Sequence, residues 1–355
     1  MLGRGTPLLY AALLGRPLSS AARRHGAALL PPKDADACGP SNLFHGYIRF
    51  NCLFRGKVNL MNTTAPLPQA DRDAVHASGH WLLARVSKKV LRPGGRETTD
   101  WLLDHLDLAG RDVVEFAPGL GVTARELLAA TPSSYTGVDS DADALAHVRT
   151  LLHEAAVADH RLIVADSEST GLESGCADAV IGEAMLTMQT DRHKSAIMAE
   201  AHRLLRPGGL YAIHELALAP DDLEDAAKTD IRRRLARAIK VNARPLTFAE
   251  WARLAEEAGF EVVDTYRAPM SLLEPRRVLA DEGPAGTARI VFNVLRDREI
   301  RTRVLAMRKT FSDHAEHLAA IGAVLRRRDG DAPTATEAPT VADGTSASET
   351  EGEDA

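Results

Sequence analysis

The fold is decided by residues 113–121, which read Val113-Val114-Glu115-Phe116-Ala117-Pro118-Gly119-Leu120-Gly121. The apolar run predicts a short buried strand from Asp112 to Phe116, and the glycine turn leads into a helix predicted over Thr123 to Ala130. Small residues in such a turn let the backbone approach a ligand, and a helix start offers unpaired amides and a partial positive charge. The stretch therefore predicts a strand–turn–helix unit that binds a ligand.

Strands and helices alternate around this unit. A helix is predicted before it, over Thr98 to Leu106, and further helices follow the second and fourth strands. Beyond the first strand, apolar runs predict strands at 135–139, 162–165, 177–181, 210–214, 261–266 and 318–325. This alternation indicates the α/β class, with a doubly wound, mostly parallel, seven-stranded sheet that helices cover on both faces.

Two helical insertions interrupt the alternation. A charged helical stretch occupies residues 221–243, after the fifth strand, where the core needs only a short loop. The second insertion, residues 271–317, follows the sixth strand and carries apolar residues at helical spacing. We expect both to form lids over a binding site. Between them, Thr247 and Glu250 have the spacing of a capping box at a helix start, and Gly259 suits the left-handed residue that ends that helix.

The two ends of the chain differ in composition from the folded domain, which is predicted as residues 70–328. Residues 1–69 lack sustained periodicity, so we expect a poorly structured N-terminal extension, with Met61 as a candidate start and a targeting peptide as the alternative. Residues 329–355 contain eight acids and no Lys or Arg, among mostly small residues that bury little apolar surface. We therefore predict a disordered acidic tail.

The composition argues against several classes of protein. With 45% apolar and 26% charged residues, the chain is typical of soluble globular proteins. Its net charge of −6 becomes about +2 without the tail acids, which argues against a nucleic-acid partner. The three cysteines, Cys38, Cys52 and Cys176, lack metal-ligand spacing, so we expect no metal site, no disulfide framework and a cytoplasmic location. No apolar run reaches the roughly 20 residues of a membrane helix, so no membrane association is expected.

Two cofactors fit the glycine turn. Residues 119–124 match the G-x-G-x-x-A variant of a dinucleotide fingerprint, so an NAD(P)-dependent oxidoreductase is one interpretation. Asp139, at the end of the second strand, fits either cofactor because its carboxylate can bind ribose hydroxyls. Glu115 favours a methionine-derived sulfonium, whose α-amino group a carboxylate can orient. Asp166 and Ser167, just beyond the third strand, favour it too, since a carboxylate there can accept a hydrogen bond from an adenine amino group.

The sequence resembles the class I S-adenosylmethionine-dependent methyltransferases, particularly those that modify small metabolites. The resemblance rests on 113–121 with Asp139, on 165–181, and on the Arg-Pro-Gly-Gly turn at 206–209 before the fifth strand. It implies S-adenosylmethionine as cofactor and a part in binding it for Glu115, Gly119, Gly121, Asp139, Asp166 and Ser167. Ala117, also expected at the cofactor, replaces the usual first glycine. It can keep the turn if its φ stays negative, so we expect an altered cofactor affinity but no loss of binding. A second Arg-Pro-Gly-Gly, at 92–95, is interpreted as coincidence.

The sequence indicates the reaction less clearly than it indicates the cofactor. Residues 182–185 read Gly-Glu-Ala-Met and lack the Asn-Pro-Pro-aromatic signature of methyltransferases that act on nucleic-acid bases or glutamine. Glu183 and His214 are predicted at the carboxyl ends of the fourth and fifth strands, where open α/β sheets place ligands. They are therefore our candidates for catalytic residues, with His214 a possible general base or, alternatively, a core histidine.

Residues before the first strand are also candidates for the site. His76, His80 and Trp81 either fold over the pocket or lie on an exposed helix. The chain is thus predicted to be a methyltransferase that acts on a small molecule. An oxidoreductase and a non-catalytic S-adenosylmethionine-binding module are the alternatives.

Overall fold

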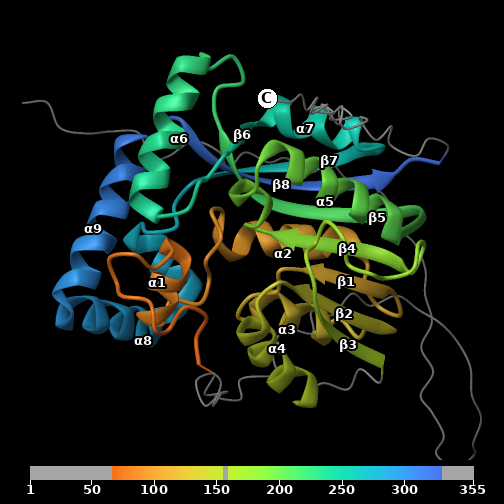
Figure 1. Cartoon of the computed structure of the whole chain (residues 1–355), viewed down its shortest axis with the longest axis horizontal. Coiled ribbons are helices and arrows are strands. Elements are labelled where there is room, and N and C mark those ends of the chain that lie inside the picture. Colours follow the sequence, from red (N-terminus) through yellow and green to blue (C-terminus); the bar gives the residue numbers. More distant parts are fainter. Residues whose placement is uncertain (1–65, 155–158, 330–355) are drawn as a thin grey trace, which may run out of the picture. The chain divides into compact units, whose positions relative to one another are not determined.

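A computed structural model describes residues 66–154 and 159–329 of the chain (Figure 1). The predicted N-terminal extension and acidic tail lie almost wholly outside the described residues, which include only 66–69 of the first and Asp329 of the second. Cys176 lies within the described ranges and is a free thiol, whereas Cys38 and Cys52 lie outside them.

The sheet has the predicted α/β topology. Its strands lie in the order β3-β2-β1-β4-β5-β8-β7, and the first five are parallel to one another. The closing strand β8 is antiparallel to both of its neighbours, β5 and β7. A two-residue strand, β6 (Leu246–Thr247), pairs with the end of β5. The remaining strands are β1 (Asp112–Phe116), β2 (Ser134–Asp139), β3 (Asp159–Val164), β4 (Ala177–Glu183), β5 (Leu205–Leu218), β7 (Phe260–Pro269) and β8 (Leu318–Arg327).

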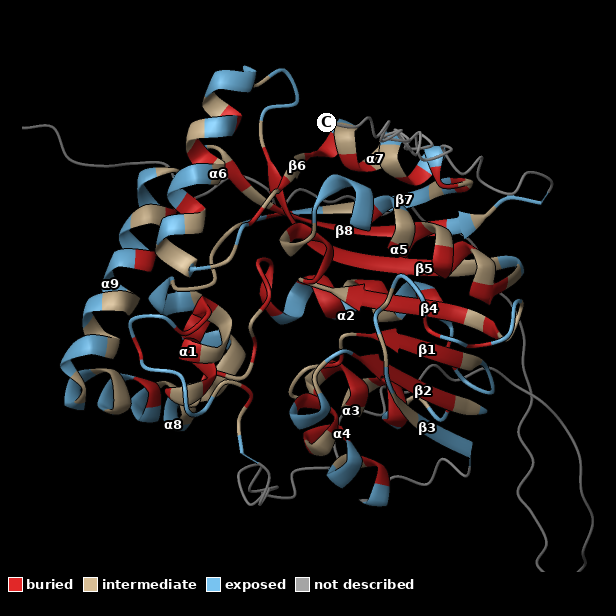
Figure 2. Cartoon of the chain, viewed as in Figure 1, coloured by how far each residue is buried: buried red, intermediate tan, exposed pale blue. Residues whose placement is uncertain are grey.

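Helices cover both faces of the sheet. On β1, Val113 and Val114 point to opposite faces because side chains alternate along a strand. Val113 packs in the cluster formed with α2, α3 and α4, and Val114 packs in the cluster formed with α5 and α7. Figure 2 shows the central strands as mostly buried. The covering helices are α2 (Gly95–Leu106), α3 (Val122–Ala129), α4 (Ala142–Glu154), α5 (Asp191–Leu204) and α7 (Phe248–Glu257), and a short 3-10 helix, η1 (Leu186–Met188), follows β4.

Both insertions are helical. The first contains α6 (Asp225–Ile239), and the second contains α8 (Pro275–Arg296) and α9 (Arg298–Asp313). With the leading helix α1 (Gly79–Arg85), they gather at the end of the sheet toward which the parallel strands run (Figure 1). Helices α1, α6 and α9 contact one another, and α8 contacts α9. The insertions therefore lie where an α/β sheet places its ligand.

The local signals at α7 are confirmed, and the predicted end of the fifth strand is wrong. Thr247 and Glu250 form a capping box in which each side chain accepts from the other residue's backbone amide, and Gly259 has a φ of +86°. The predicted fifth strand ended at His214, but β5 continues to Leu218 because β8 pairs with it along that whole length. His214 therefore lies inside the strand instead of at its carboxyl end.

Among the described helices, none is both long enough and apolar enough to cross a membrane.

Thr247→Ala should lower the free energy of unfolding by about 1 kcal/mol, because the substitution leaves the Glu250 amide without its capping oxygen. Urea denaturation followed by circular dichroism measures the change. Thr302→Ala is the matched control, since this exposed threonine bonds only to the Arg298 carbonyl of its own helix. Equal stability of Thr247→Ala and wild type would contradict the assignment of the cap.

Candidate active site

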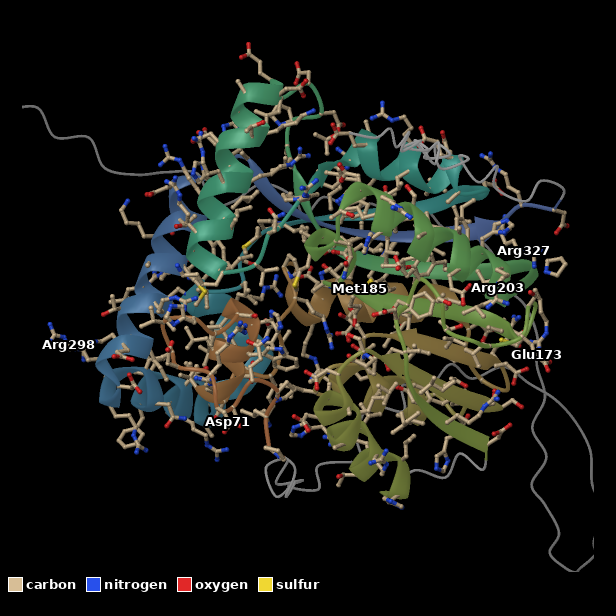
Figure 3. All side chains as sticks on the ribbon, in the orientation of Figure 1. Asp71, Glu173, Met185, Arg203, Arg298 and Arg327 are labelled. Carbon is tan, nitrogen blue, oxygen red and sulfur yellow. The ribbon has the colours of Figure 1, made fainter. Side chains whose placement is uncertain are left out.

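A pocket of about 410 Å³ opens at the carboxyl ends of β1, β2 and β4. We call it the strand-end pocket. Five of the residues predicted to bind the cofactor or to act in catalysis line it, namely Glu115, Ala117, Gly119, Asp139 and Glu183. Figure 3 labels Met185, another lining residue, which in this view lies where the strand ends face the insertion helices. The pocket is therefore built at the edge of the sheet where the predicted residues converge.

The glycine turn brings backbone to the pocket wall. Gly119 has a φ of +56°, and a Cβ added there would meet only the Ala117 carbonyl, 3.8 Å away. Gly121 serves the packing of helices instead, because with a φ of +72° its added Cβ would lie 2.6 Å from Leu151 Cδ1 on α4. It therefore permits close packing of α3 and α4 and does not line the pocket. The condition of a negative φ at Ala117 is not met, because its φ is +50°, a conformation that costs an alanine roughly 1–2 kcal/mol.

Asp139 is held with its carboxylate at the pocket wall. Its Oδ1 accepts from the backbone amide of Asp141 at 2.9 Å, and its Oδ2 accepts from that of Gly119 at 3.3 Å. The residue is 8% exposed, and burial raises its pKa although these backbone bonds oppose the rise. Two amides therefore fix the orientation of this carboxylate and leave acceptor capacity for a ligand.

Glu115 is a buried carboxyl group that has one hydrogen-bond partner among the described residues. The Tyr135 hydroxyl donates to its Oε2 at 2.6 Å. Burial raises the pKa of Glu115 to about 8, against the opposing effect of the Tyr135 hydrogen bond. At pH 7 the group is therefore mostly protonated, and a cation placed beside it would favour loss of that proton.

Glu183, at the end of β4, is buried and ionised. Its Oε1 accepts from the Thr99 hydroxyl at 2.6 Å, its Oε2 accepts from the Thr123 hydroxyl, and Arg92 Nε lies 3.2 Å from Oε2. Burial alone would raise the pKa of Glu183, but the Arg92 charge and the hydrogen bonds outweigh it and hold the pKa to about 2. Arg92 also donates to both threonine hydroxyls, so the ion pair is part of one closed network.

His214 joins this network from β5 and does not line the pocket. The backbone amide of Gly94 donates to its Nε2 at 3.0 Å, so Nδ1 carries the proton and donates to Glu183 Oε1 at 3.0 Å. The side chain is fully buried, and burial lowers its pKa although Glu183 opposes this. Both ring nitrogens are thus engaged by the protein. This geometry favours the alternative of a core histidine over a general base.

The stretch 92–95, whose repeat of Arg-Pro-Gly-Gly is interpreted as coincidence, nevertheless lies at the site, since Arg92 and Gly94 contact Glu183 and His214. Insertion helix α8 contacts the residues just before this stretch. Glu282 Oε1 accepts from the backbone amides of Lys89 and Val90 at 2.8 and 3.0 Å. A segment before the first strand therefore connects an insertion helix to the end of β4.

The structure does not bring every predicted residue to the pocket. Asp166 is exposed and Ser167 half-buried, and neither lines it. His80 and Trp81 do line the pocket, whereas His76 is exposed and bonds to Asp73. Within 66–154 and 159–329, no group of three or more His, Cys, Asp or Glu side chains is placed to hold a metal ion.

Two sequence comparisons relate this chain to known proteins. A model described as a methyltransferase domain matches residues 113–209. An uncharacterized protein of Haemophilus influenzae is 36% identical over 248 residues, which are 68% of this chain and 96% of that protein.

Solved structures share the fold. Haemonchus contortus phosphoethanolamine N-methyltransferase 2, in complex with S-adenosyl-L-methionine, matches with a TM-score of 0.56 and 16% identity, over 74% of this chain and 59% of that one. The (4+2) cyclase SpnF matches with a TM-score of 0.54 and 16% identity, over 75% of this chain and 98% of that one. One fold can support different reactions. The family model therefore carries more weight than the fold, and it favours a sulfonium cofactor over a nicotinamide dinucleotide.

Arg92→Met should lower the free energy of unfolding by about 3–5 kcal/mol, because it leaves the Glu183 carboxylate buried without its cation. Urea denaturation at pH 7 measures the loss. Arg253→Met is the control: Arg253 pairs with Glu257 on the surface at 3.9 Å, and its loss should cost no more than about 1 kcal/mol. Similar small losses in both variants would contradict the description of Glu183 as an ionised, Arg92-dependent group.

Proposed function

We propose that this chain, which belongs to the class I S-adenosylmethionine-dependent methyltransferases, methylates a small-molecule acceptor beside the strand-end pocket. The observation that carries the proposal is the convergence of Glu115, the Gly119 turn and Asp139 on one pocket at the carboxyl ends of adjacent parallel strands. The cofactor is S-adenosylmethionine, which supplies an electrophilic methyl group on a positively charged sulfur.

The pocket residues fit that cofactor by charge and by shape. We assign to Asp139 the ribose hydroxyls, because two backbone amides already orient its carboxylate. We assign to Glu115 the α-amino group, since a buried carboxyl group at the wall can ionise beside a cation. Gly119 leaves room for close backbone approach. The predicted contact of Asp166 and Ser167 with adenine stays a prediction.

The protein's part in the reaction is to position the acceptor and to exclude water. Methyl transfer is an in-line displacement, so correct placement of the nucleophile supplies much of the rate. We assign positioning roles to Glu183 and His214, since their hydrogen-bonding groups are engaged by Arg92, the two threonines and Gly94. The helical insertions around the pocket support the proposal that the acceptor is a small molecule. The cytoplasmic location, too, stays a prediction.

The two alternatives make different predictions in solution. An oxidoreductase would bind NAD(P) in a calorimetric titration. A non-catalytic module would bind S-adenosylmethionine but would methylate nothing in a metabolite screen. Calorimetry with both cofactors, followed by mass spectrometry of reaction mixtures, separates the three functions.

Asp139→Ala should weaken S-adenosylmethionine binding by about 1–3 kcal/mol, roughly 5- to 160-fold in Kd, because polar groups of the ligand lose their partner. Isothermal titration calorimetry gives the Kd. Asp143→Ala, an exposed acid in the first turn of α4, serves as the control. Unchanged affinity in Asp139→Ala would exclude Asp139 from the binding site.

S-adenosylmethionine binding at pH 7 should release a proton, because Glu115 is mostly protonated before binding and ionises beside the ligand's amino group. Titrations in buffers of different ionisation enthalpy measure this release. Glu115→Gln should abolish it. Glu126→Gln should retain it, since the pKa of Glu126 is also raised by burial but the residue does not line the pocket. Binding heats that are independent of the buffer in wild type would refute the role given to Glu115.

A further inference from the structure

A second pocket, of about 90 Å³, adjoins the strand-end pocket under the insertion helices. We call it the lid pocket. It lies among α1, α6, α9, η1 and the ends of β4 and β5, and it shares four lining residues with the strand-end pocket, namely His80, Leu91, Ala184 and Met188. An acceptor in the lid pocket would therefore lie next to a cofactor in the strand-end pocket.

The walls of the lid pocket are almost entirely apolar. Most of its lining side chains are aliphatic, thioether or aromatic, among them Leu83, Leu216, Leu235, Ile239, Met307 and Phe311. The lid pocket is smaller than the apolar cavity of about 150 Å³ that binds benzene, but it adjoins the strand-end pocket at the four shared residues. A single ring or a short branched chain is therefore the largest group that it can take, with the polar group of the acceptor at the junction. Burying a charge against such walls is costly unless a partner neutralises it.

The one carboxylate at the wall is already fully engaged. Glu215 Oε1 accepts from the backbone amides of Met185 and Leu186 at 3.0 and 2.8 Å. Its Oε2 accepts from the amide and the hydroxyl of Thr187 at 3.0 and 2.6 Å. These four bonds use the acceptor positions of the carboxylate. Glu215 therefore fixes η1 and offers little to a cationic acceptor.

His80 is the polar group at the junction of the two pockets. Its ring contacts Trp81, with 4.8 Å between ring centroids, and no other described residue hydrogen-bonds to it. Burial lowers the pKa of His80 to about 4, so the imidazole is neutral at physiological pH. A neutral imidazole has one nitrogen that accepts a hydrogen bond. The junction can therefore receive one O–H or S–H donor.

Resting on the proposed methyltransferase function, we infer that the acceptor is an uncharged apolar molecule of about single-ring size whose hydroxyl or thiol hydrogen-bonds to His80. The acceptor's oxygen or sulfur uses a lone pair to form the bond to the methyl carbon. Its proton passes to the free ring nitrogen of His80, and the old carbon–sulfur bond breaks with its electron pair on sulfur. His80 then returns the proton to solvent.

This class differs from the acceptor for which the Haemonchus enzyme is named. Phosphoethanolamine carries a phosphate and an amine, and neither finds a free countercharge in the lid pocket. The apolar walls thus predict that the two proteins differ in substrate although their folds match.

Calorimetry with S-adenosylhomocysteine-saturated protein tests the inference. The probes are p-cresol, the matched cation tyramine, the matched anion 4-hydroxyphenylacetate, and toluene, which lacks the hydroxyl. We expect p-cresol to bind at least about tenfold more tightly than either charged probe, and several-fold more tightly than toluene because of the bond to His80. His80→Phe should remove the preference for p-cresol over toluene.

Leu272→Glu places a charge in the lid pocket from the half-buried turn after β7 and should weaken p-cresol binding at least about tenfold. Leu273→Glu is the matched control, because Leu273 is its half-buried neighbour and does not line the pocket. Both variants should keep wild-type affinity for S-adenosylhomocysteine, which also shows that they fold.

The outcomes separate the inference from the proposed function. If S-adenosylhomocysteine binds but p-cresol does not, or if a charged probe binds as tightly as p-cresol, the acceptor class is wrong and the methyltransferase proposal stands. An unchanged p-cresol preference in His80→Phe would likewise overturn the role of His80. If wild type fails to bind S-adenosylhomocysteine, the proposed function fails and the acceptor class falls with it.

Discussion

The buried charge of Glu183 is the constraint on which the site depends. A carboxylate at the end of a central strand is costly to remove from water, and it stays ionised only because Arg92 and three hydrogen-bond donors surround it. Those partners come from the segment before α2, from α2, from α3 and from β5. Neutralising one charge therefore brings four separate parts of the chain together beside the strand-end pocket.

The site has two environments. On one side, Asp139 and the protonated Glu115 form a polar wall that suits a cationic cofactor. On the other side, the insertion helices form an apolar pocket in which the one carboxylate, Glu215, is engaged by η1. His80 lies at the boundary. The fold thus places a polar donor site and an apolar acceptor site side by side.

Features fixed by neighbouring residues could be predicted from the sequence, and those fixed by distant contacts could not. The capping box at Thr247 depends on two residues that are three positions apart. The position of Asp139 could be predicted because the end of its strand is recognisable in the sequence. Arg92 meets Glu183 from a segment far away in the chain, and no local pattern shows that pairing. His214 was misplaced because the pairing with β8 extends β5, which an apolar run does not reveal.

The central claim is that the strand-end pocket binds S-adenosylmethionine through Asp139 and Glu115. A crystal structure of the protein with S-adenosylhomocysteine tests it most directly. The account predicts the ribose hydroxyls within hydrogen-bonding distance of the Asp139 carboxylate and the amino group beside Glu115. A ligand bound elsewhere, or one in this pocket without contact to either carboxyl group, would contradict it.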